Sequence, residues 1–190
     1  MAVTRKRFFD IMASFPSGVA VVTTVAPDGK PRGLTTTAVC SVSASPPTIL
    51  VCVDLSSRTL DALRLRRRFV VNFLGHGRSH LGLLFASKTD DKFAHVSWRE
   101  TSSGLPLLHE DSLAWAECCT VHDLEVGDHV VLVARVEDGG VEPELEPPLM
   151  YYRRSWGVWS PVHEEQEPEP VAIAAREISA RDLRWQGAEF

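Results

Sequence analysis

The sequence of 190 residues predicts a mainly β fold with short helices, in which an antiparallel sheet closes into a barrel or folds into a sandwich. Six or seven segments have the β-branched composition or the two-residue alternation of strands, whereas only three short segments have helical spacing. Short turns, rather than long helical crossovers, join most of the predicted strands. This pattern argues against a doubly wound parallel sheet.

The first part of the chain contains a short helix and three strands. Phe8, Ile11, Met12 and Phe15 recur at three- and four-residue spacing, which predicts one apolar face of a helix over 5–15. The following residues predict a strand over 19–26, a turn at Pro27-Asp28-Gly29, a second strand over 32–44 and a buried third strand over 48–54. The glycine of the turn tolerates a positive φ, which suits a hairpin connection.

The remaining elements are two helices, a polar loop and four more strands. Ser56 and Ser57 are candidate N-caps of a helix that carries Leu60, Leu63 and Leu65. Further along, we expect a strand over 69–74, a helix over 79–87, a polar loop over 89–104, and strands over 113–122, 129–136 and 149–153. The polar loop is a candidate lid or cofactor-edge loop.

Composition and charge narrow the possible functions. The net charge of -5 and the pI near 5.8 provide no broad positive field for nucleic acid. No run approaches the roughly 20 apolar residues of a membrane span, and no secretory signal is present, so we expect a cytoplasmic protein. Cys40, Cys52, Cys118 and Cys119 form no C-x-x-C pair and are expected to be reduced core residues, and we expect no metal site.

The end of the chain differs in composition from its body. After Pro161 the sequence becomes acidic and proline-rich, which is unsuited to a packed core. We therefore expect one domain over 1–160, followed by a linker and tail over 161–190. Good helix formers over 171–185 indicate a short helix within that tail.

The second predicted strand carries a row of small hydroxyl side chains. With a period of two, the face expected to meet the core holds Leu34, Thr36, Ala38, Cys40, Val42 and Ala44. The opposite face holds Gly33, Thr35, Thr37, Val39, Ser41, Ser43 and Ser45. Hydroxyl and backbone N–H donors on such a face suit the edge of a flat polar ring or a phosphate. The alternative is an ordinary Thr-rich strand with one face in water.

Two further segments are candidates for binding a nucleotide. The helix start Ser56-Ser57-Arg58-Thr59 offers N–H groups, hydroxyls and a guanidinium to a phosphate, although such a start is also simply a cap. His129 at a strand end and the aromatic and basic cluster over 151–156 are suited to a nucleotide, or to surface and packing roles. The sequence contains neither a G-x-G-x-x-G nor a P-loop motif, so a nucleotide would be held by another architecture.

A series of short motifs runs along about 8–159. In order, they are Phe8-Phe9-Asp10-Ile11-Met12, Gly33-Leu34-Thr35-Thr36-Thr37-Ala38, Phe69-Val70-Val71-Asn72-Phe73-Leu74, Phe85-Ala86-Ser87, Asp91-Lys92-Phe93, Gly127-Asp128-His129 and Pro148-Leu149-Met150-Tyr151-Tyr152. In this order they resemble the short-chain flavin reductase family, the reductase components of two-component flavin-dependent monooxygenases. The resemblance implies an FMN-binding split barrel, which is a Greek-key-like antiparallel barrel, and a homodimer.

The resemblance also implies a set of site residues. The flavin ring would be bordered or covered by Thr35, Thr36, Thr37, Ala38, Cys40, Ser41, Phe85, Ala86 and Ser87, with Val53 and Asp54 as further cofactor-binding residues. The flavin phosphate would be held by Ser56, Ser57, Arg58 and Thr59. The nicotinamide nucleotide would be received by His129, the candidate catalytic residue, together with Tyr152, Arg153, Arg154 and Trp156.

The function that the resemblance implies is transfer of a hydride from NADH or NADPH to FMN or FAD, with release of the reduced flavin to a flavin-dependent monooxygenase. Backbone N–H groups near Thr35–Ala38 would stabilise the negative charge of the reduced ring. One alternative is a slow or non-catalytic electron carrier of the same fold, which would retain its flavin tightly. Another is a non-enzymatic split-barrel dimer whose hydroxyl face is solvated.

Overall fold

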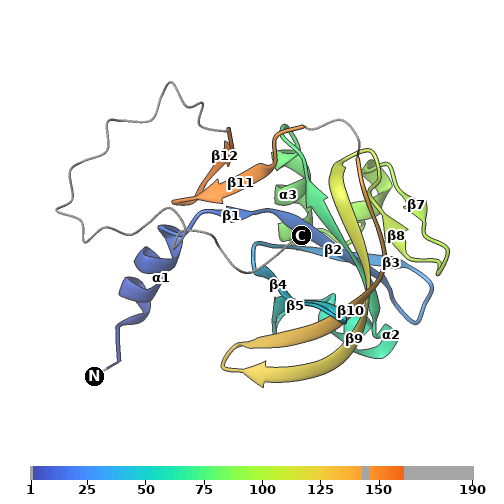
Figure 1. The fold of residues 1–190 in the computed structure, drawn as a ribbon, viewed down its shortest axis with the longest axis horizontal. Helices are drawn as coiled ribbons and strands as arrows, with labels where there is room; N and C mark the ends of the chain where they lie inside the picture. Colours follow the sequence, from blue (N-terminus) through green and yellow to red (C-terminus); the bar gives the residue numbers. More distant parts are fainter. Residues whose placement is uncertain (1, 143–145, 161–190) are drawn as a thin grey trace, which may run out of the picture. The chain divides into compact units, whose positions relative to one another are not determined.

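The described chain, residues 2–142 and 146–160 of a computed structural model, consists mainly of strands (Figure 1). The helices are α1 (Arg5–Ala13), α2 (Leu60–Arg66), α3 (Ser79–Ala86) and the 3-10 helix η1 (Lys92–His95). The first strands are β1 (Ser17–Gly18), β2 (Ala20–Val25), β3 (Pro31–Thr36), β4 (Val39–Ala44), β5 (Pro47–Asp54) and β6 (Arg68–Leu74). The later strands are β7 (Arg99–Glu100), β8 (Pro106–Leu107), β9 (Ser112–Val126), β10 (His129–Val141), β11 (Leu149–Tyr152) and β12 (Ser155–Val158). The predicted tail over 161–190 lies outside the described residues.

Seven strands form one antiparallel sheet in the order β3-β2-β6-β9-β10-β5-β4. Its two edge strands, β3 and β4, are joined by Thr37 and Ala38 alone. At this join the N–H of Cys52 on β5 donates to the carbonyl of Ala38 at 3.0 Å, and Thr36 Oγ1 donates to the carbonyl of Cys52 at 3.3 Å. The sheet therefore curls until its edges meet, and the predicted mainly β, antiparallel barrel is confirmed.

The predicted continuous strand over 32–44 is wrong, because the structure divides it into β3 and β4. β3 pairs with β2 and β4 pairs with β5 at the other edge of the sheet, so the backbone must bend between them. A regular two-residue alternation assumes no such bend. As a result Cys40, Val42 and Ala44, predicted to face the core, are exposed on an edge strand. Cys40 is therefore no core residue, in contrast to the buried Cys118.

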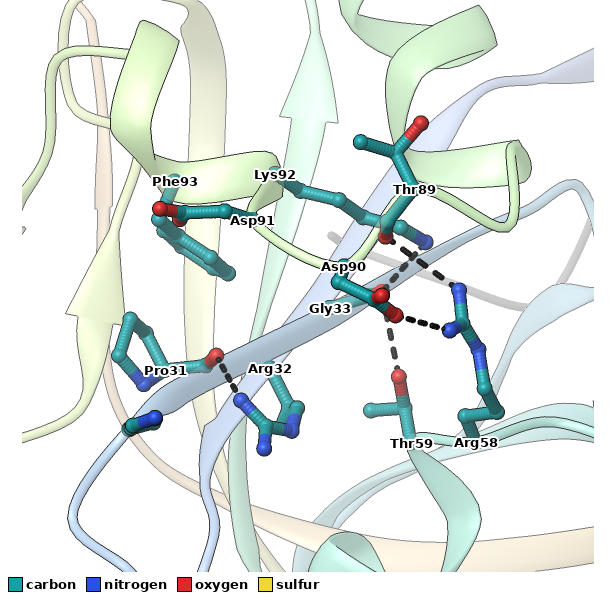
Figure 2. A pocket seen from close by; sticks show the side chains of 11 residues that line it. Pro31, Arg32, Gly33, Arg58, Thr59, Thr89, Asp90, Asp91, Lys92 and Phe93 are labelled. Atoms are coloured by element: carbon teal, nitrogen blue, oxygen red, sulfur yellow. Dashed lines mark hydrogen bonds and ion pairs between the residues drawn. The ribbon is translucent and has the colours of Figure 1, made fainter.

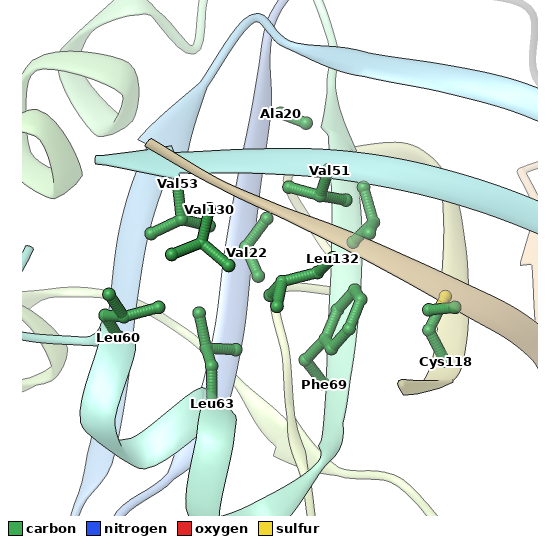
Figure 3. Packing of buried hydrophobic residues seen from close by; sticks show 12 residues of the cluster. Ala20, Val22, Val51, Val53, Leu60, Leu63, Phe69, Cys118, Val130 and Leu132 are labelled. Carbon is green, nitrogen blue, oxygen red and sulfur yellow. The ribbon is translucent and has the colours of Figure 1, made fainter. Parts of the chain in front are cut away.

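The inside of the curled sheet is filled by an apolar core, against which α2 packs (Figure 3). Val22, Phe69 and Leu132 from the sheet are at most 1% exposed, and so is Leu63 of α2, which points toward them in Figure 3. Burying a side chain such as Phe69 completely stabilises a fold by about 1.5–3 kcal/mol. Leu65, which the sequence also places on this helix, is 69% exposed, because it follows Leu63 by two residues and therefore lies on the opposite side of the helix.

A second sheet, of the three strands β1-β11-β12, packs against α3 through Trp156. A Cβ atom on Gly82 of α3 would lie 2.9 Å from Trp156 Cη2, so the glycine permits the indole to contact the helix backbone. Tyr151 adds a ring 5.0 Å from that of Trp156. β12 was not predicted, because its hairpin turn consists of Arg153 and Arg154 at φ 47° and 64° instead of the usual Asn or Gly.

The described residues contain neither a membrane-crossing helix nor a metal cluster. Across 2–142 and 146–160, no helix is both long and apolar enough to cross a membrane. Over the same ranges, no three His, Cys, Asp or Glu side chains converge as metal ligands would. All four cysteines are free thiols, and burial raises the pKa of the Cys118 thiol to about 12.

Candidate functional site

A cavity of about 630 Å³ lies between β3, the segment before α2 and the loop that leads into η1 (Figure 2). This volume is within the roughly 300–1,000 Å³ that is typical of ligand pockets. The lining residues are Lys30, Pro31, Arg32 and Gly33, then Arg58 and Thr59, and finally Thr89, Asp90, Asp91, Lys92 and Phe93. Three segments that are far apart in the sequence therefore form one site.

Gly33 is the point at which these three segments are joined. Its carbonyl accepts hydrogen bonds from Thr59 Oγ1 at 3.1 Å and from Lys92 Nζ at 3.2 Å. Lys92 Nζ also donates to the carbonyl of Phe85 at 2.7 Å, which ties η1 to the end of α3. Burial, and after it the charge of Arg58, lowers the pKa of Lys92 below its ordinary value. Two of the three ammonium N–H groups are used here, which leaves one for a ligand.

Arg58 presents its guanidinium to the cavity from another wall. It forms an ion pair with Asp90 and donates from Nη2 to the carbonyl of Thr89 at 3.3 Å (Figure 2). The side chains of Arg58 and Asp90 are 53% and 92% exposed. Pairs this exposed contribute only about 0.2–1 kcal/mol, so a ligand phosphate can displace Asp90 from Arg58 at small cost.

The lining has an excess of positive charge. Its cations are Lys30, Arg32, Arg58 and Lys92, and its carboxylates are Asp90 and Asp91. Asp91 already accepts a hydrogen bond from the N–H of Ala94 at 3.2 Å, as the cap of η1. An excess of cations is suited to a phosphorylated ligand.

The predicted phosphate segment over 56–59 divides into two parts. Arg58 and Thr59 line the cavity. Ser56 instead donates from its N–H and its Oγ to Asp54 Oδ1, both at 2.7 Å, and these hydrogen bonds lower the pKa of Asp54. Ser57 Oγ accepts from the N–H of Thr59 at 3.3 Å. The predicted N-caps are wrong, because these hydroxyls close the turn that precedes α2 and the residue before the helix is Thr59.

The predicted ring-edge residues follow the cavity along β3, the join after it and β4, but they do not line it. Thr35 Oγ1 donates to the carbonyl of Gly82 at 2.7 Å, and Thr36 Oγ1 accepts from the N–H of Ala38 at 3.0 Å. The hydroxyls of Thr35 and Thr36 thus hold the edge of the barrel. The exposed members of the predicted set are Thr37, Ala38, Cys40 and Ser41.

The predicted segment Phe85-Ala86-Ser87 supports the cavity from behind. Phe85 is buried and meets the ring of Phe93 edge-on, with centroids 5.1 Å apart. Ser87 Oγ donates to the carbonyl of Leu84 at 2.7 Å and to Thr89 Oγ1 at 2.9 Å. These contacts fix the start of the loop that leads into η1 relative to α3.

His129 lies at the start of β10, opposite Asp54 at the end of β5. Its Nδ1 is 2.7 Å from Asp128 Oδ1, and this hydrogen bond lowers the pKa of Asp128. The side chain of His129 is 44% exposed, so its ring is accessible to a ligand. Val53, the residue before Asp54, is buried in the core.

The predicted nicotinamide residues come from two different sheets. His129 belongs to the seven-stranded sheet, whereas the three-stranded sheet carries Tyr152, Arg153, Arg154 and Trp156 in and beside its hairpin turn. The guanidinium of Arg153 lies over the ring of Tyr152, 5.4 Å from its centroid. The N–H of Arg153 donates to the carbonyl of Ala13 at 2.9 Å, which ties the hairpin to the end of α1.

The sequence predicts the loop over 89–104 as a cofactor edge, and its start lines the cavity, but no site role was predicted for Asp90, Asp91 or Lys92, and Lys30 and Arg32 were missed altogether. Charged side chains are usually solvated, so they give no local indication of a site. Phe93 offers one signal, since an aromatic residue within a polar loop indicates that the loop returns to the core there. Lys92 comes directly before it and is carried into the cavity wall.

An antiparallel barrel with a cation-lined cavity of this size defines a class of β-barrel proteins whose cavity suits a phosphorylated ligand. Comparison with known families narrows that class. A model described as the flavin reductase like domain matches residues 12–160, and the chain belongs to this family. The resemblance drawn from the sequence motifs is therefore confirmed.

Individual relatives agree with this assignment. The chain is 44% identical over 169 residues to flavin reductase (NADH) of Kitasatospora aureofaciens, with 88% of each chain covered. It is 38% identical over 152 residues to flavin reductase (NADPH) of Lentzea aerocolonigenes, covering 80% of this chain and 88% of the relative. A solved homologue of nitrilotriacetate monooxygenase component B from Mycobacterium thermoresistibile has a TM-score of 0.78 at 30% identity, covering 86% of this chain and 89% of that chain.

Proposed function

We propose that the chain is an NAD(P)H-dependent flavin reductase that releases reduced FMN or FAD to a partner flavin-dependent monooxygenase. The observation that carries the proposal is the cavity in which Arg58 and Lys92 meet around Gly33, because it offers two cations to a flavin phosphate. The two relatives named as flavin reductases, and the solved relative named after a monooxygenase component, support the same function.

The residues present fit a flavin at this site. Arg58 needs only to exchange an exposed carboxylate for a phosphate, and Lys92 retains an N–H group. Thr37 and Ala38, exposed at the join between β3 and β4, offer an open edge to the isoalloxazine ring. When bound, the flavin supplies the acceptor for the nicotinamide hydride. The chain's own residues bind and orient the reactants, and no side-chain acid or base is required.

Modest phosphate affinity suits a flavin that must leave the enzyme after reduction. In the described structure the guanidinium of Arg58 is shared with Asp90 and the carbonyl of Thr89. A phosphate must compete with these partners, which lowers its net gain in binding free energy. The same competition assists release of the product to the oxygenase.

We infer that His129 contacts the nicotinamide nucleotide and that the hairpin over 152–156 contributes the remaining contacts to that nucleotide. Asp128 engages His129 Nδ1, so Nε2 is the ring nitrogen that faces a ligand. His129 is next to the end of β5, which leads to Arg58 within four residues of Asp54. This placement supports a role near the flavin.

Purified protein is expected to oxidise NADH or NADPH only when FMN or FAD is supplied, because side chains alone do not accept a hydride. The loss of nicotinamide absorbance, followed with each of the four nicotinamide and flavin pairs, measures this. Absence of turnover with every pair would contradict the proposed function. A protein that stays yellow through purification and turns over slowly would instead be an electron carrier.

We propose that the working protein is a homodimer that uses α1 and the residues just after it as an interface. Phe8, Phe9, Ile11, Met12 and Phe15 are 46–65% exposed. An apolar surface of this kind is unfavourable in a monomer and marks an interaction site. Replacing Phe8 and Met12 with serine is expected to shift the mass measured by light scattering from dimer to monomer, whereas Arg7→Ser is not. A monomeric unmodified protein would exclude the proposal.

We propose a cytoplasmic location, which the four free thiols support because disulfides are rare in that compartment. We also propose that residues 1–160 form the catalytic domain and that 161–190 are a tail outside the chemistry. The match of the family model to residues 12–160 supports this division.

A further inference from the structure

The cavity extends along β3 away from the predicted ring edge. Its lining on this part of the chain is 30–33, whereas the predicted ring edge is Thr35–Ala38. Successive strand residues advance about 3.3 Å, so Arg32 lies roughly 13 Å from Thr36. The contacts around Gly33 lie between these two positions. A phosphate held beside Gly33 therefore has further cavity on the side away from the ring.

This far part of the cavity has cations of its own, Lys30 and Arg32. Arg32 Nη2 is 3.3 Å from Asp28, and the two side chains are 36% and 48% exposed, so the pair is weak and can be exchanged. FMN has a single phosphate, for which Arg58 and Lys92 are sufficient. A second pair of cations beyond them has no counterpart on FMN.

Apolar surface accompanies these cations. Pro31 and Phe93 line the cavity, and Figure 2 shows both across from Arg58. Phe93 is only 8% exposed, and its ring meets those of Phe85 and Trp98 edge-on, with centroids 5.1 and 5.8 Å away. The wall is thus fixed before any ligand binds. A rigid apolar wall beside cations is suited to a purine ring next to its phosphate.

We propose that this part of the cavity binds the adenylate half of FAD, and that FAD is the preferred flavin of the enzyme. Lys30 and Arg32 would hold the second phosphate, and the adenine would pack against Pro31 and Phe93. FMN would occupy only the part nearer the ring edge. The proposal rests on the proposed function, because it assigns one end of the same flavin site.

The test measures binding of FMN and FAD to the full chain without nicotinamide, by titration of flavin fluorescence. We expect FAD to bind about tenfold more tightly than FMN. The double variant Lys30→Ala and Arg32→Ala is expected to lose about tenfold in FAD affinity and to keep its FMN affinity within roughly twofold. AMP is expected to compete with FAD but not with FMN. Arg99→Ala, which removes an exposed arginine on β7, is the matched control and should change neither the FAD affinity nor the FMN affinity.

The other outcomes are distinct. Equal affinities for FMN and FAD in the unmodified protein overturn the proposal. Equal losses for both flavins in the double variant also overturn it, because the cations would then act only through their general field. If the double variant binds FAD as before but turns over NADPH more slowly relative to NADH, Lys30 and Arg32 belong to the nicotinamide nucleotide site and the proposal is overturned. If the unmodified protein binds neither flavin, the proposed function itself fails.

Discussion

Replacing Arg58 with alanine is expected to raise the flavin KM about tenfold or more while kcat stays within roughly twofold. A hydrogen bond between a guanidinium and a phosphate contributes about 1.5–3 kcal/mol, and the 53% exposure of Arg58 favours the lower end of that range. In the proposed function Arg58 binds the phosphate and takes no part in the hydride transfer, so the loss is expected in KM. Steady-state kinetics at saturating nicotinamide measure both constants.

Asp90→Asn should lower the flavin KM, which Arg58→Ala raises. Removing the carboxylate frees Arg58 from an exposed pair of about 0.2–1 kcal/mol, which lowers the flavin KM by up to about fivefold. Arg99→Ala again serves as the control for loss of an exposed arginine. If Arg58→Ala has an ordinary flavin KM, the phosphate is bound elsewhere and the cavity is not the flavin site.

The fold could be predicted wherever local pattern and tertiary pairing agree. Buried strands such as β6 have apolar, β-branched sequences, and the predicted range 69–74 differs from Arg68–Leu74 by one residue. The division between β3 and β4 could not be predicted, because the alternation continues through Thr37 and Ala38. Only the pairing of one half with β2 and of the other with β5 requires the bend. Long-range pairing thus overrides the local period.

The site was predictable only where its residues form a local motif. Arg58 and Thr59 stand in a compact motif of phosphate-binding residue types, and both line the cavity. Lys30 and Lys92 carry no such motif, and only the barrel brings them to the same cavity from segments about 60 residues apart. Thr35 and Thr36 show the opposite case, in which a predicted binding residue does not line the cavity. The alternation predicts Thr35 on a ligand surface and the family resemblance implies Thr36 beside the flavin ring, whereas both hydroxyls are engaged in the protein's own hydrogen bonds.

Gly33 couples this site to the core more directly than any predicted residue. A Cβ atom at position 33 would lie 2.7 and 2.8 Å from Phe85 Cε1 and Cδ1, and 3.3 Å from the carbonyl oxygen of Val22. The ring of Phe85 is 1% exposed and is held edge-on by Phe93, which lines the cavity. Because the ring has no free space, any added group at Gly33 must displace the cavity wall with it.

Gly33→Ala is therefore expected to lower the free energy of unfolding and to raise the flavin KM together. Overpacking costs about 1–3 kcal/mol, whereas the loss of glycine flexibility in the unfolded chain returns about 0.4–1 kcal/mol. The net destabilisation should be about 1–2 kcal/mol, measured by denaturant unfolding. Displacing Phe85 also moves its carbonyl, which holds Lys92, so the flavin KM should rise in the same variant.

Gly157→Ala is the matched control, since a Cβ atom there has nothing within 4 Å. It should be neutral or slightly stabilising, because only the unfolded-state effect of losing a glycine applies. In a second step, Phe85→Leu in the Gly33→Ala background should recover part of the lost stability, giving a coupling of more than about 0.5 kcal/mol in a double-mutant cycle. Equal unfolding midpoints for the two alanine variants would show that Gly33 and Phe85 are not in contact. The cavity wall would then be independent of the core, and the flavin KM of Gly33→Ala should remain ordinary.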